Sequence, residues 1–382
     1  MIIVNIHSIL IVKYSYNLRE DKMVFRKDIL IMNQHTRFNL PLCLTVEEDA
    51  FSHADEIVAS YIPDIKGQKT LIVSEQFLID TYKEKITGIQ EDFDGAGIYA
   101  IGESNFDEAV KIAKMVCIQD IKVIVGFGGG RVLDMAKYAA FISKAVYICL
   151  PTTLSNDSLA SPFSVLGTEG RSRKTLPCKI PAAIIVDTDM IVNAPIGQTL
   201  SGIGDTLAKH TALYDWKLAC QAAGTHMDDF AYAIGRMSFD SVYHCDEKNI
   251  KSNVFIRILS RSLVMGGLAM EIAGSSRPCS GSEHLFSHAL EEYYPDIRVS
   301  HGIGVALGSI GACMFQGRDE SRLLEVMKTF GIDTNPASYG ITKDIFADVW
   351  SKASGTRPGR ISILDSTDLD RAWLDEIYDR MV

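Results

Sequence analysis

Between residues 69 and 187 the sequence alternates short, continuously apolar runs with amphipathic segments. The apolar runs predict strands at residues 69–74, 95–101, 122–126, 145–150 and 182–187. The segments between them repeat apolar residues at helical spacing and predict helices at residues 77–85, at 106–117 and from 132 onward. Because continuously apolar strands alternate with helices, we expect a parallel sheet that helices cover on both faces.

From about Pro195 onward, long helical patterns dominate and strand-like runs become rare. We therefore predict an α/β domain at residues 37–197 and an all-α domain at residues 198–382. Neither an internal repeat nor a low-complexity linker separates the two domains, so they should pack closely. A cleft between them is the expected ligand site.

Residues 1–36 precede the first globular-looking stretch and are predicted to form a loose N-terminal extension. The apolar start, Met1–Val12, is too short to span a bilayer. It also lacks the basic start and the small-residue cleavage site of a secretory signal, so we expect no membrane span. Met23 and Met32 offer later starts, and the sequence leaves open whether residues 1–31 belong to the native protein.

The composition is that of an ordinary globular protein, with 47% hydrophobic and 23% charged residues among 382. The formal net charge of −10 argues against a nucleic-acid partner, which selects clustered Lys and Arg. It leaves a small anionic ligand open, because a few nearby cations outweigh a distant field. The eight cysteines show no zinc-like CxxC spacing and predict reduced thiols in a cytoplasmic protein.

A glycine cluster at residues 126–130 follows the third predicted strand and opens a helix. Gly128, Gly129 and Gly130 would let the backbone approach a pyrophosphate, whose charge the helix N-terminus favours. A plain tight turn is the alternative. The GGGxxxDxxK pattern resembles the superfamily of dehydroquinate synthases and iron-containing alcohol dehydrogenases, in which this loop carries the dinucleotide pyrophosphate. The resemblance implies further cofactor contacts from this pattern and from the following PTT segment: Asp134, Lys137, Thr152 and Thr153.

Ser74 and Glu75 end the first predicted strand and are placed to meet an adenosine ribose. Glu75 would accept hydrogen bonds from the ribose hydroxyls and repel a 2′-phosphate, which favours NAD(H) over NADP(H). The alternative is an acid at a helix N-terminus, where the helix dipole stabilises its charge. The sequence therefore predicts NAD(H) or NADP(H) as the cofactor and leaves the choice between them open.

Asp205, His284, His288 and His301 form the candidate metal constellation. A zinc or iron site needs about three nitrogen or oxygen ligands and one open position. One carboxylate and two imidazoles meet that need, and His284 and His288 share one helix face at i, i+4. A single histidine is more often a core or surface residue, so the prediction depends on the whole set.

Two stretches of the chain resemble those of glycerol-1-phosphate dehydrogenases. Residues 204–216 match GDxLAKxTAxxDW and residues 275–288 match SSRPxSGSEHxxSH, within a resemblance that covers about residues 69–310. The resemblance implies a dehydroquinate synthase-like fold and a metal held by Asp205, His284 and His301, with Zn²⁺ favoured and Fe²⁺ as the alternative. It implies an NAD(P)H oxidoreductase that reduces a phosphorylated ketone, such as dihydroxyacetone phosphate, to sn-glycerol 1-phosphate.

By the same resemblance, His288 lies beside the metal or faces the substrate, and it is a candidate for carrying a proton to solvent. Asp157 matches a position near the substrate hydroxyls of related polyol dehydrogenases; the alternative is a turn residue. Arg277 stands seven residues before His284, the spacing at which dehydroquinate synthases place an arginine near their anionic substrate. The predicted catalytic residues are thus His288 and Asp157. The predicted substrate contacts are Asp157, Asp205, Lys209 and Arg277.

Three other functions stay open as alternatives. A dehydrogenase for an uncharged polyol such as glycerol would use the same site without a phosphate contact. A dehydroquinate-synthase-like sugar-phosphate cyclase is disfavoured, because residues 158–163 and Asp205 stand where those enzymes have a GGK triplet and a glutamate ligand. A silent binding protein is disfavoured by the complete ligand set. The basic run at residues 171–174 is better explained as a solvated hairpin tip than as a phosphate site. The sequence predicts a phosphorylated ketose or polyol as partner and leaves a homo-oligomer open.

Overall fold

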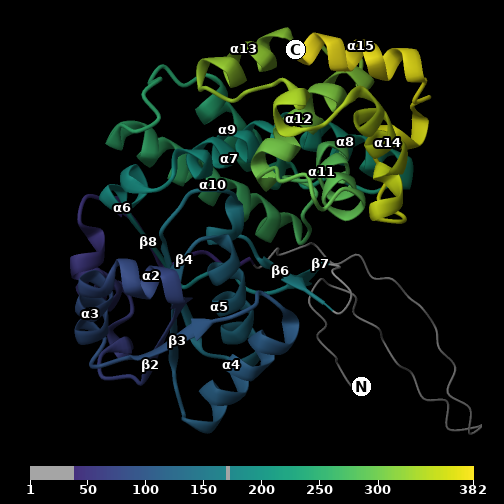
Figure 1. Cartoon of the computed structure of the whole chain (residues 1–382). Helices are drawn as coiled ribbons and strands as arrows, with labels where there is room; N and C mark the ends of the chain where they lie inside the picture. Colours follow the sequence, from purple (N-terminus) through teal and green to yellow (C-terminus); the bar gives the residue numbers. More distant parts are fainter. Residues whose placement is uncertain (1–37, 169–172) are drawn as a thin grey trace, which may run out of the picture. The chain divides into compact units, whose positions relative to one another are not determined.

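The structure is a computed structural model that describes residues 38–168 and 173–382 (Figure 1). The predicted N-terminal extension and Arg171 of the basic run lie outside these described residues. Residues 39–382 form one compact unit. The predicted domain boundary after residue 197 falls in the first turn of helix α7 (Ile196–Leu207), and the division into two domains stays a prediction.

Six strands form one parallel sheet in the order β1-β8-β5-β4-β2-β3. The strands are β1 (Cys43–Glu47), β2 (Thr70–Glu75), β3 (Gly97–Ile101), β4 (Val123–Gly128), β5 (Val146–Pro151) and β8 (Ala183–Asp187). All but β1 match a predicted strand closely, which confirms the parallel α/β sheet. Strand β1 was not predicted, because this edge strand is only partly buried and polar Thr45 and Glu47 interrupt its apolar pattern.

Helices cover both faces of the sheet. One face packs against α1 (Ala54–Tyr61) and α3 (Lys83–Asp92), and the other packs against α4 (Phe106–Ile118) and α5 (Gly130–Ser143). Consecutive strand residues alternate between the two cores: Ile72 faces α1 and α3, whereas Val73 faces α4 and α5. Because both faces are buried, the strands read as continuously apolar runs.

The predicted helix at residues 77–85 is wrong in one respect, because two helices occupy this region. Helix α2 (Gln76–Thr81) ends before Tyr82, and α3 begins at Lys83. The Tyr82 ring packs edge-on against Phe127, with the ring centroids 6.5 Å apart. The break between α2 and α3 thus coincides with a packing contact between residues far apart in the sequence, whereas the local periodicity predicted one continuous helix.

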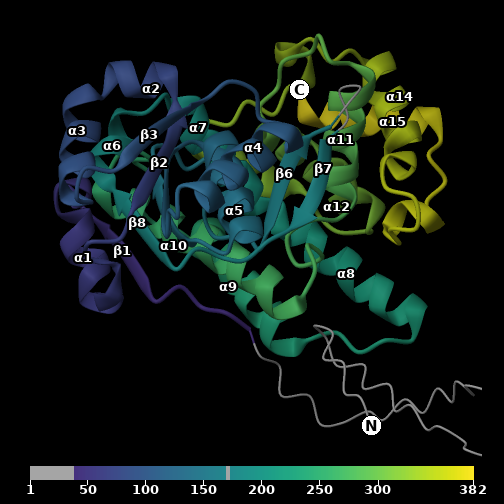
Figure 2. The ribbon, with the colours of Figure 1, turned by 90° about the horizontal axis from the view of Figure 1, so that it is seen from below.

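A two-stranded antiparallel hairpin follows β5, formed by β6 (Phe163–Gly167) and β7 (Arg173–Pro177). The described part of the basic run, Arg173 and Lys174, begins β7, which agrees with the expected hairpin. Figures 1 and 2 both show this hairpin beside helix α11 (Ser282–Tyr293), and Arg173 Nη1 lies 3.9 Å from an oxygen of Glu291 in that helix.

The described residues after β8 are helical or irregular, as predicted for this half of the chain. The further helices are α6 (Thr188–Asn193), α8 (Lys209–Ala223), α9 (Asp229–Tyr243), α10 (Asn253–Ala273), α12 (His301–Phe315), α13 (Ser321–Thr329), α14 (Lys343–Ala353) and α15 (Arg371–Met381). One hydrophobic core joins the α4–α5 face of the sheet to these helices. Within the described ranges, no helix combines the length and the apolar character needed to cross a membrane.

Candidate active site

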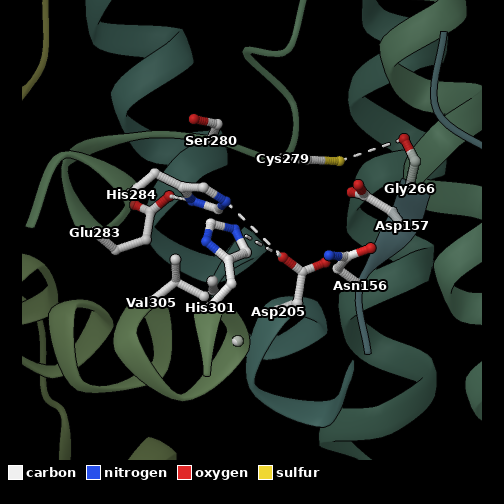
Figure 3. A network of polar contacts seen from close by, with 12 residues as sticks. Asn156, Asp157, Asp205, Gly266, Cys279, Ser280, Glu283, His284, His301 and Val305 are labelled. Atoms are coloured by element: carbon white, nitrogen blue, oxygen red, sulfur yellow. Dashed lines mark hydrogen bonds and ion pairs between the residues drawn. The ribbon is translucent and has the colours of Figure 1, made fainter. Parts of the chain in front are cut away.

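Asp205, His284 and His301 come together from three helices, α7, α11 and α12 (Figure 3). One ligand atom from each lies within 4.8 Å of the others. The Nε2 atoms of both histidines lie 3.9 Å from Oδ1 of Asp205. The structure thus unites the three residues that the sequence analysis proposed as metal ligands; metal binding itself stays a prediction.

Two glycines next to these residues allow α7 and α12 to cross closely. A Cβ atom at Gly204 would lie 2.2 Å from the carbonyl oxygen of Gly302. A Cβ atom at Gly302 would lie 1.8 Å from the carbonyl oxygen of Ser201. No larger residue fits without moving a backbone, so this crossing sets how near Asp205 and His301 can approach.

Each histidine of the cluster has a carboxylate at its other ring nitrogen. Glu283 Oε1 lies 2.8 Å from Nδ1 of His284, and Glu291 Oε1 lies 3.6 Å from Nδ1 of His301. The hydrogen bond to Glu283 holds the His284 ring and keeps the proton on Nδ1, which leaves Nε2 as the ligand atom; Glu291 faces His301 from just beyond hydrogen-bond distance. Neither glutamate was predicted from the sequence to take part in the site. The SEH motif contains Glu283, but only the folded helices reveal which nitrogen it faces.

The two glutamates differ in their surroundings. Burial raises the pKa of Glu283 to about 7. Burial also works against the charge of Glu291, but the neighbouring His301 ring prevails and lowers the pKa of Glu291 to about 2. Glu283 is fixed further by Thr211, whose hydroxyl donates to Oε2 at 2.8 Å.

Lys209 joins Asp205 to the predicted substrate residue Asp157. Its Nζ lies 3.6 Å from Oδ2 of Asp205 and 3.7 Å from Oδ2 of Asp157, and it is fully buried. Burial disfavours the ammonium form, but the neighbouring acidic groups, these carboxylates among them, raise the pKa of Lys209. Burial and the charge of Asp205 raise the pKa of Asp157 to about 6. Figure 3 places Asp157 on the opposite side of Asp205 from the histidines.

His288 lies at the edge of the cluster. Its ring centroid is 6.2 Å from those of His284 and His301, and its Nε2 accepts a hydrogen bond from Arg357 at 3.1 Å. Burial and then the charge of Arg357 lower the pKa of His288 well below its usual range. The side chain is therefore held neutral; its role in proton transfer stays a prediction.

Arg277, the predicted phosphate contact, donates from Nη1 to the carbonyl oxygen of Ile361 at 2.5 Å. It thereby holds the loop that follows α14 against the segment before α11. Two arginines of that loop, Arg357 and Arg360, also reach the region and were missed, because their distance along the chain gives no local signal. A direct contact of Arg277 with phosphate stays a prediction.

The predicted nucleotide residues gather at the carboxyl edge of the sheet. Gly128 ends β4 beside Pro151 of β5, and its carbonyl oxygen accepts a hydrogen bond from the Thr152 amide at 2.9 Å. A Cβ atom at Gly129 would lie 3.2 Å from the Thr153 hydroxyl. Gly130 begins α5. Strand order reverses between β2 and β4, and such a switch point is where parallel α/β sheets bind nucleotides.

Ser74 and Glu75 end β2 at this switch point. The buried Ser74 hydroxyl donates to the carbonyl oxygen of Phe127 at 2.8 Å, which ties β2 to the glycine loop. Glu75 Oε1 lies 3.7 Å from Nη1 of Arg131. Arg131 was not predicted from the sequence, and its guanidinium suits the 2′-phosphate of NADP(H). The pair therefore offers Glu75 to the ribose hydroxyls of NAD(H) and Arg131 to the 2′-phosphate of NADP(H). Contacts of Ser74 and Glu75 with a ribose stay predictions.

Asp134 and Lys137 are buried behind the glycine loop. Their charged atoms lie 3.0 Å apart. Lys137 donates to the Ser158 carbonyl at 2.9 Å, and Asp134 accepts from the Val165 amide at 3.0 Å. Both residues thus brace η3 (Asp157–Leu159) and β6 in this structure, and a direct cofactor contact stays a prediction.

The chain is similar in sequence to known dehydrogenases. A family model described as iron-containing alcohol dehydrogenase matches residues 45–195. The glycerol-1-phosphate dehydrogenase (NAD(P)+) of Aeropyrum pernix is 32% identical over 338 residues, 88% of this chain and 95% of its own length. The enzyme of the same name from Sulfurisphaera tokodaii is 36% identical over 269 residues, 70% of this chain and 76% of its own.

Solved structures confirm the predicted fold class. Glycerol dehydrogenase from Schizosaccharomyces pombe superposes with a TM-score of 0.71 at 22% identity, covering 91% of each chain. Sulfoacetaldehyde reductase from Bifidobacterium kashiwanohense, in complex with NAD+, gives a TM-score of 0.68 at 15% identity, covering 91% of this chain and 99% of its own. At these identities the likeness concerns the fold alone.

Proposed function

Because the chain belongs to the glycerol-1-phosphate dehydrogenase family, we propose that it reduces dihydroxyacetone phosphate to sn-glycerol 1-phosphate with NADH or NADPH, using a divalent metal. The observation that carries this proposal is the cluster of Asp205, His284 and His301, with a carboxylate behind each imidazole. A second feature that supports the proposal is the glycine loop at residues 128–130, which joins β4 to α5 at the carboxyl edge of the sheet.

The cluster fits a divalent metal on its own chemistry. Oδ1 of Asp205 lies 3.9 Å from Nε2 of His284 and of His301, beyond hydrogen-bond distance, so three ligand atoms face one another without bonding to one another, as around a cation. Two imidazoles and one carboxylate suit Zn²⁺, with Fe²⁺ as the alternative. Such a cation would act as a Lewis acid that polarises the substrate carbonyl. Asp205, His284 and His301 would hold it.

The protein's own residues position the reactants. Gly128, Gly129 and Gly130 would let the pyrophosphate approach the start of α5, and Thr152 and Thr153 would flank the nicotinamide, which supplies the hydride. Lys209 holds the carboxylates of Asp157 and Asp205 together beside the histidines. His288, or a water that it orders, would relay between solvent and the substrate the proton that the new hydroxyl needs.

We propose further that the protein works on small molecules in the cytoplasm. All eight cysteines are free, which suits a reducing compartment, and the net charge of −10 disfavours nucleic acid. Sedimentation analysis would decide between a monomer and the homo-oligomer that the sequence leaves open.

The test is reduction of dihydroxyacetone phosphate by the metal-loaded protein, with a chiral assay of the product. We expect sn-glycerol 1-phosphate, and a loss of at least a hundredfold in His284→Ala. His244→Ala, which removes an exposed histidine of the helical region, should retain the rate and serves as the control. Turnover of dihydroxyacetone without turnover of its phosphate would favour the uncharged-polyol alternative.

A further inference from the structure

Three arginines gather beside the candidate metal cluster. Arg357 and Arg360 come from the loop after α14, and Arg277 comes from the segment between α10 and α11. Burial, and then the charges of Arg277 and Arg357, lower the pKa of Arg360 to about 10. The guanidinium of Arg360 therefore lies near enough to Arg277 and Arg357 to be repelled by both.

These arginines bind neutral acceptors in the structure. Arg277 donates to the Ile361 carbonyl, and Arg360 donates to the Ser276 hydroxyl at 3.2 Å and to the Ser280 carbonyl. Within the described ranges, no aspartate or glutamate forms an ion pair with any of the three. The carboxylates of Asp215 and Glu283 act on Arg360 only from beyond ion-pair distance, so an anionic ligand in direct contact would stabilise this arrangement.

Contacts of the two loop arginines place them at the rim of the metal cluster. Arg357 Nη2 lies 3.1 Å from Nε2 of His288 and 3.0 Å from the hydroxyl of Thr175 in β7. Arg360 holds the carbonyl of Ser280, which Figure 3 shows on the His284 side of the site.

Both side chains keep unused donors. A guanidinium has five N–H donors. Arg357 uses Nη2 for Thr175 and His288, and its Nε and Nη1 bond to none of the described residues. Nε of Arg360 is buried without a partner. Phosphate oxygens match such planar, charged donors better than any neutral group does.

We propose that Arg357 and Arg360 form the subsite for the substrate's phosphate group, while Arg277 positions their loop. This inference rests on the proposed function, since it assumes that the reacting carbonyl lies at the Asp205–His284–His301 cluster. A triose phosphate has its phosphate only a few bonds from the carbonyl, so the rim of the cluster is where that group falls. The contact of Arg357 with Thr175 also makes the β6–β7 hairpin one wall of the subsite.

The experiment compares wild type with Arg357→Ala and Arg357→Lys, all metal-loaded. We expect the ratio of kcat/KM for dihydroxyacetone phosphate to that for dihydroxyacetone to fall about ten- to a hundredfold in Arg357→Ala. Lysine keeps the charge but loses the planar fork, so Arg357→Lys should fall between. Arg322→Ala, an exposed arginine of α13, is the matched control and should leave the ratio unchanged.

Calorimetric titration with inorganic phosphate gives a second readout that needs no turnover. Wild type should bind phosphate, and Arg357→Ala should bind it at least tenfold more weakly at equal metal content. Equal affinity in both proteins, no binding to wild type, or equal losses on both substrates would overturn the subsite. If wild type binds phosphate through Arg357 but never reduces dihydroxyacetone phosphate, the subsite stands and the proposed reaction fails.

Arg277→Ala separates positioning from contact. Because Arg277 braces the loop through Ile361, its loss should lower the melting temperature and reduce turnover of both substrates alike. A loss confined to the phosphorylated substrate would instead make Arg277 the phosphate contact and overturn the assignment of a positioning role.

Discussion

Oε1 of Glu283 lies 2.8 Å from Nδ1 of His284, the next residue in the chain. This contact keeps the proton on Nδ1 and presents Nε2 to Asp205. The backbone amide of Gly281 donates to the same glutamate oxygen at 2.6 Å, so the carboxylate is anchored at the start of α11.

Glu283→Gln should therefore weaken metal binding about ten- to a hundredfold, because a neutral amide holds the ring less firmly and makes it a poorer ligand. Competition with a chromophoric chelator measures that affinity directly. Glu292→Gln, an exposed change on the same helix, is the control. Wild-type affinity in Glu283→Gln would show that the contact is only structural.

Gly302→Ala should destabilise the protein and empty the metal site together. The new methyl group would meet the Ser201 carbonyl at 1.8 Å and force α7 and α12 apart. Overpacking of this kind costs about 1–3 kcal/mol or more in the free energy of unfolding. Gly197→Ala, in the helix α7 that Gly302 of α12 crosses, meets no atom within 4 Å and should be tolerated. Denaturant unfolding with metal analysis checks both, and an unchanged metal content in Gly302→Ala would contradict the account.

Cofactor choice should depend on the pair of Glu75 and Arg131. Arg131→Ala should lower kcat/KM for NADPH about tenfold more than for NADH, because it removes the cation beside the ribose position. Glu75→Gln should shift the preference toward NADPH. The assay is initial-rate kinetics with both cofactors on each variant. Parallel changes for both cofactors would show that neither residue contacts the ribose.

Stability should depend on pH through His210 in α8. Burial, and then the charges of Arg318 and Arg236, lower its pKa from 6.5 to about 3, against the weaker opposing effect of Asp240. Between about pH 3 and 6.5, His210 is therefore protonated in the unfolded chain and neutral in the folded chain. Its contribution to the free energy of unfolding rises with pH over this range. Urea unfolding of His210→Gln should show a shallower rise than wild type. A steeper or equal rise would contradict this, and His244→Gln is the exposed control.

Local sequence patterns were enough to predict the buried strands of the sheet and the candidate metal ligands. Buried strands such as β4 and β5 show continuous apolar runs because both sheet faces are covered, and they were found within two residues of their ends. The ligand set of Asp205, His284 and His301 was recognisable because long motifs surround it. The three residues meet in the structure as that resemblance implied.

The features that sequence reasoning missed depend on contacts between distant segments. Glu291 supports His301 from the preceding helix, and Arg357 reaches His288 from the far end of the chain. The sequence around Glu291 or Arg357 looks no different from that around an ordinary charged residue on the surface. The break at Tyr82 likewise coincides with packing against Phe127, which periodicity does not reveal.

The most direct test of the central claim is a metal titration of the stripped protein, with reduction of dihydroxyacetone phosphate recorded against metal bound. The account predicts that the rate rises in proportion to bound Zn²⁺ or Fe²⁺ and levels off at about one ion per chain. His284→Ala and His301→Ala should bind the ion far more weakly and stay inactive at that loading. A full rate without metal, or undiminished metal binding in both variants, would contradict the account.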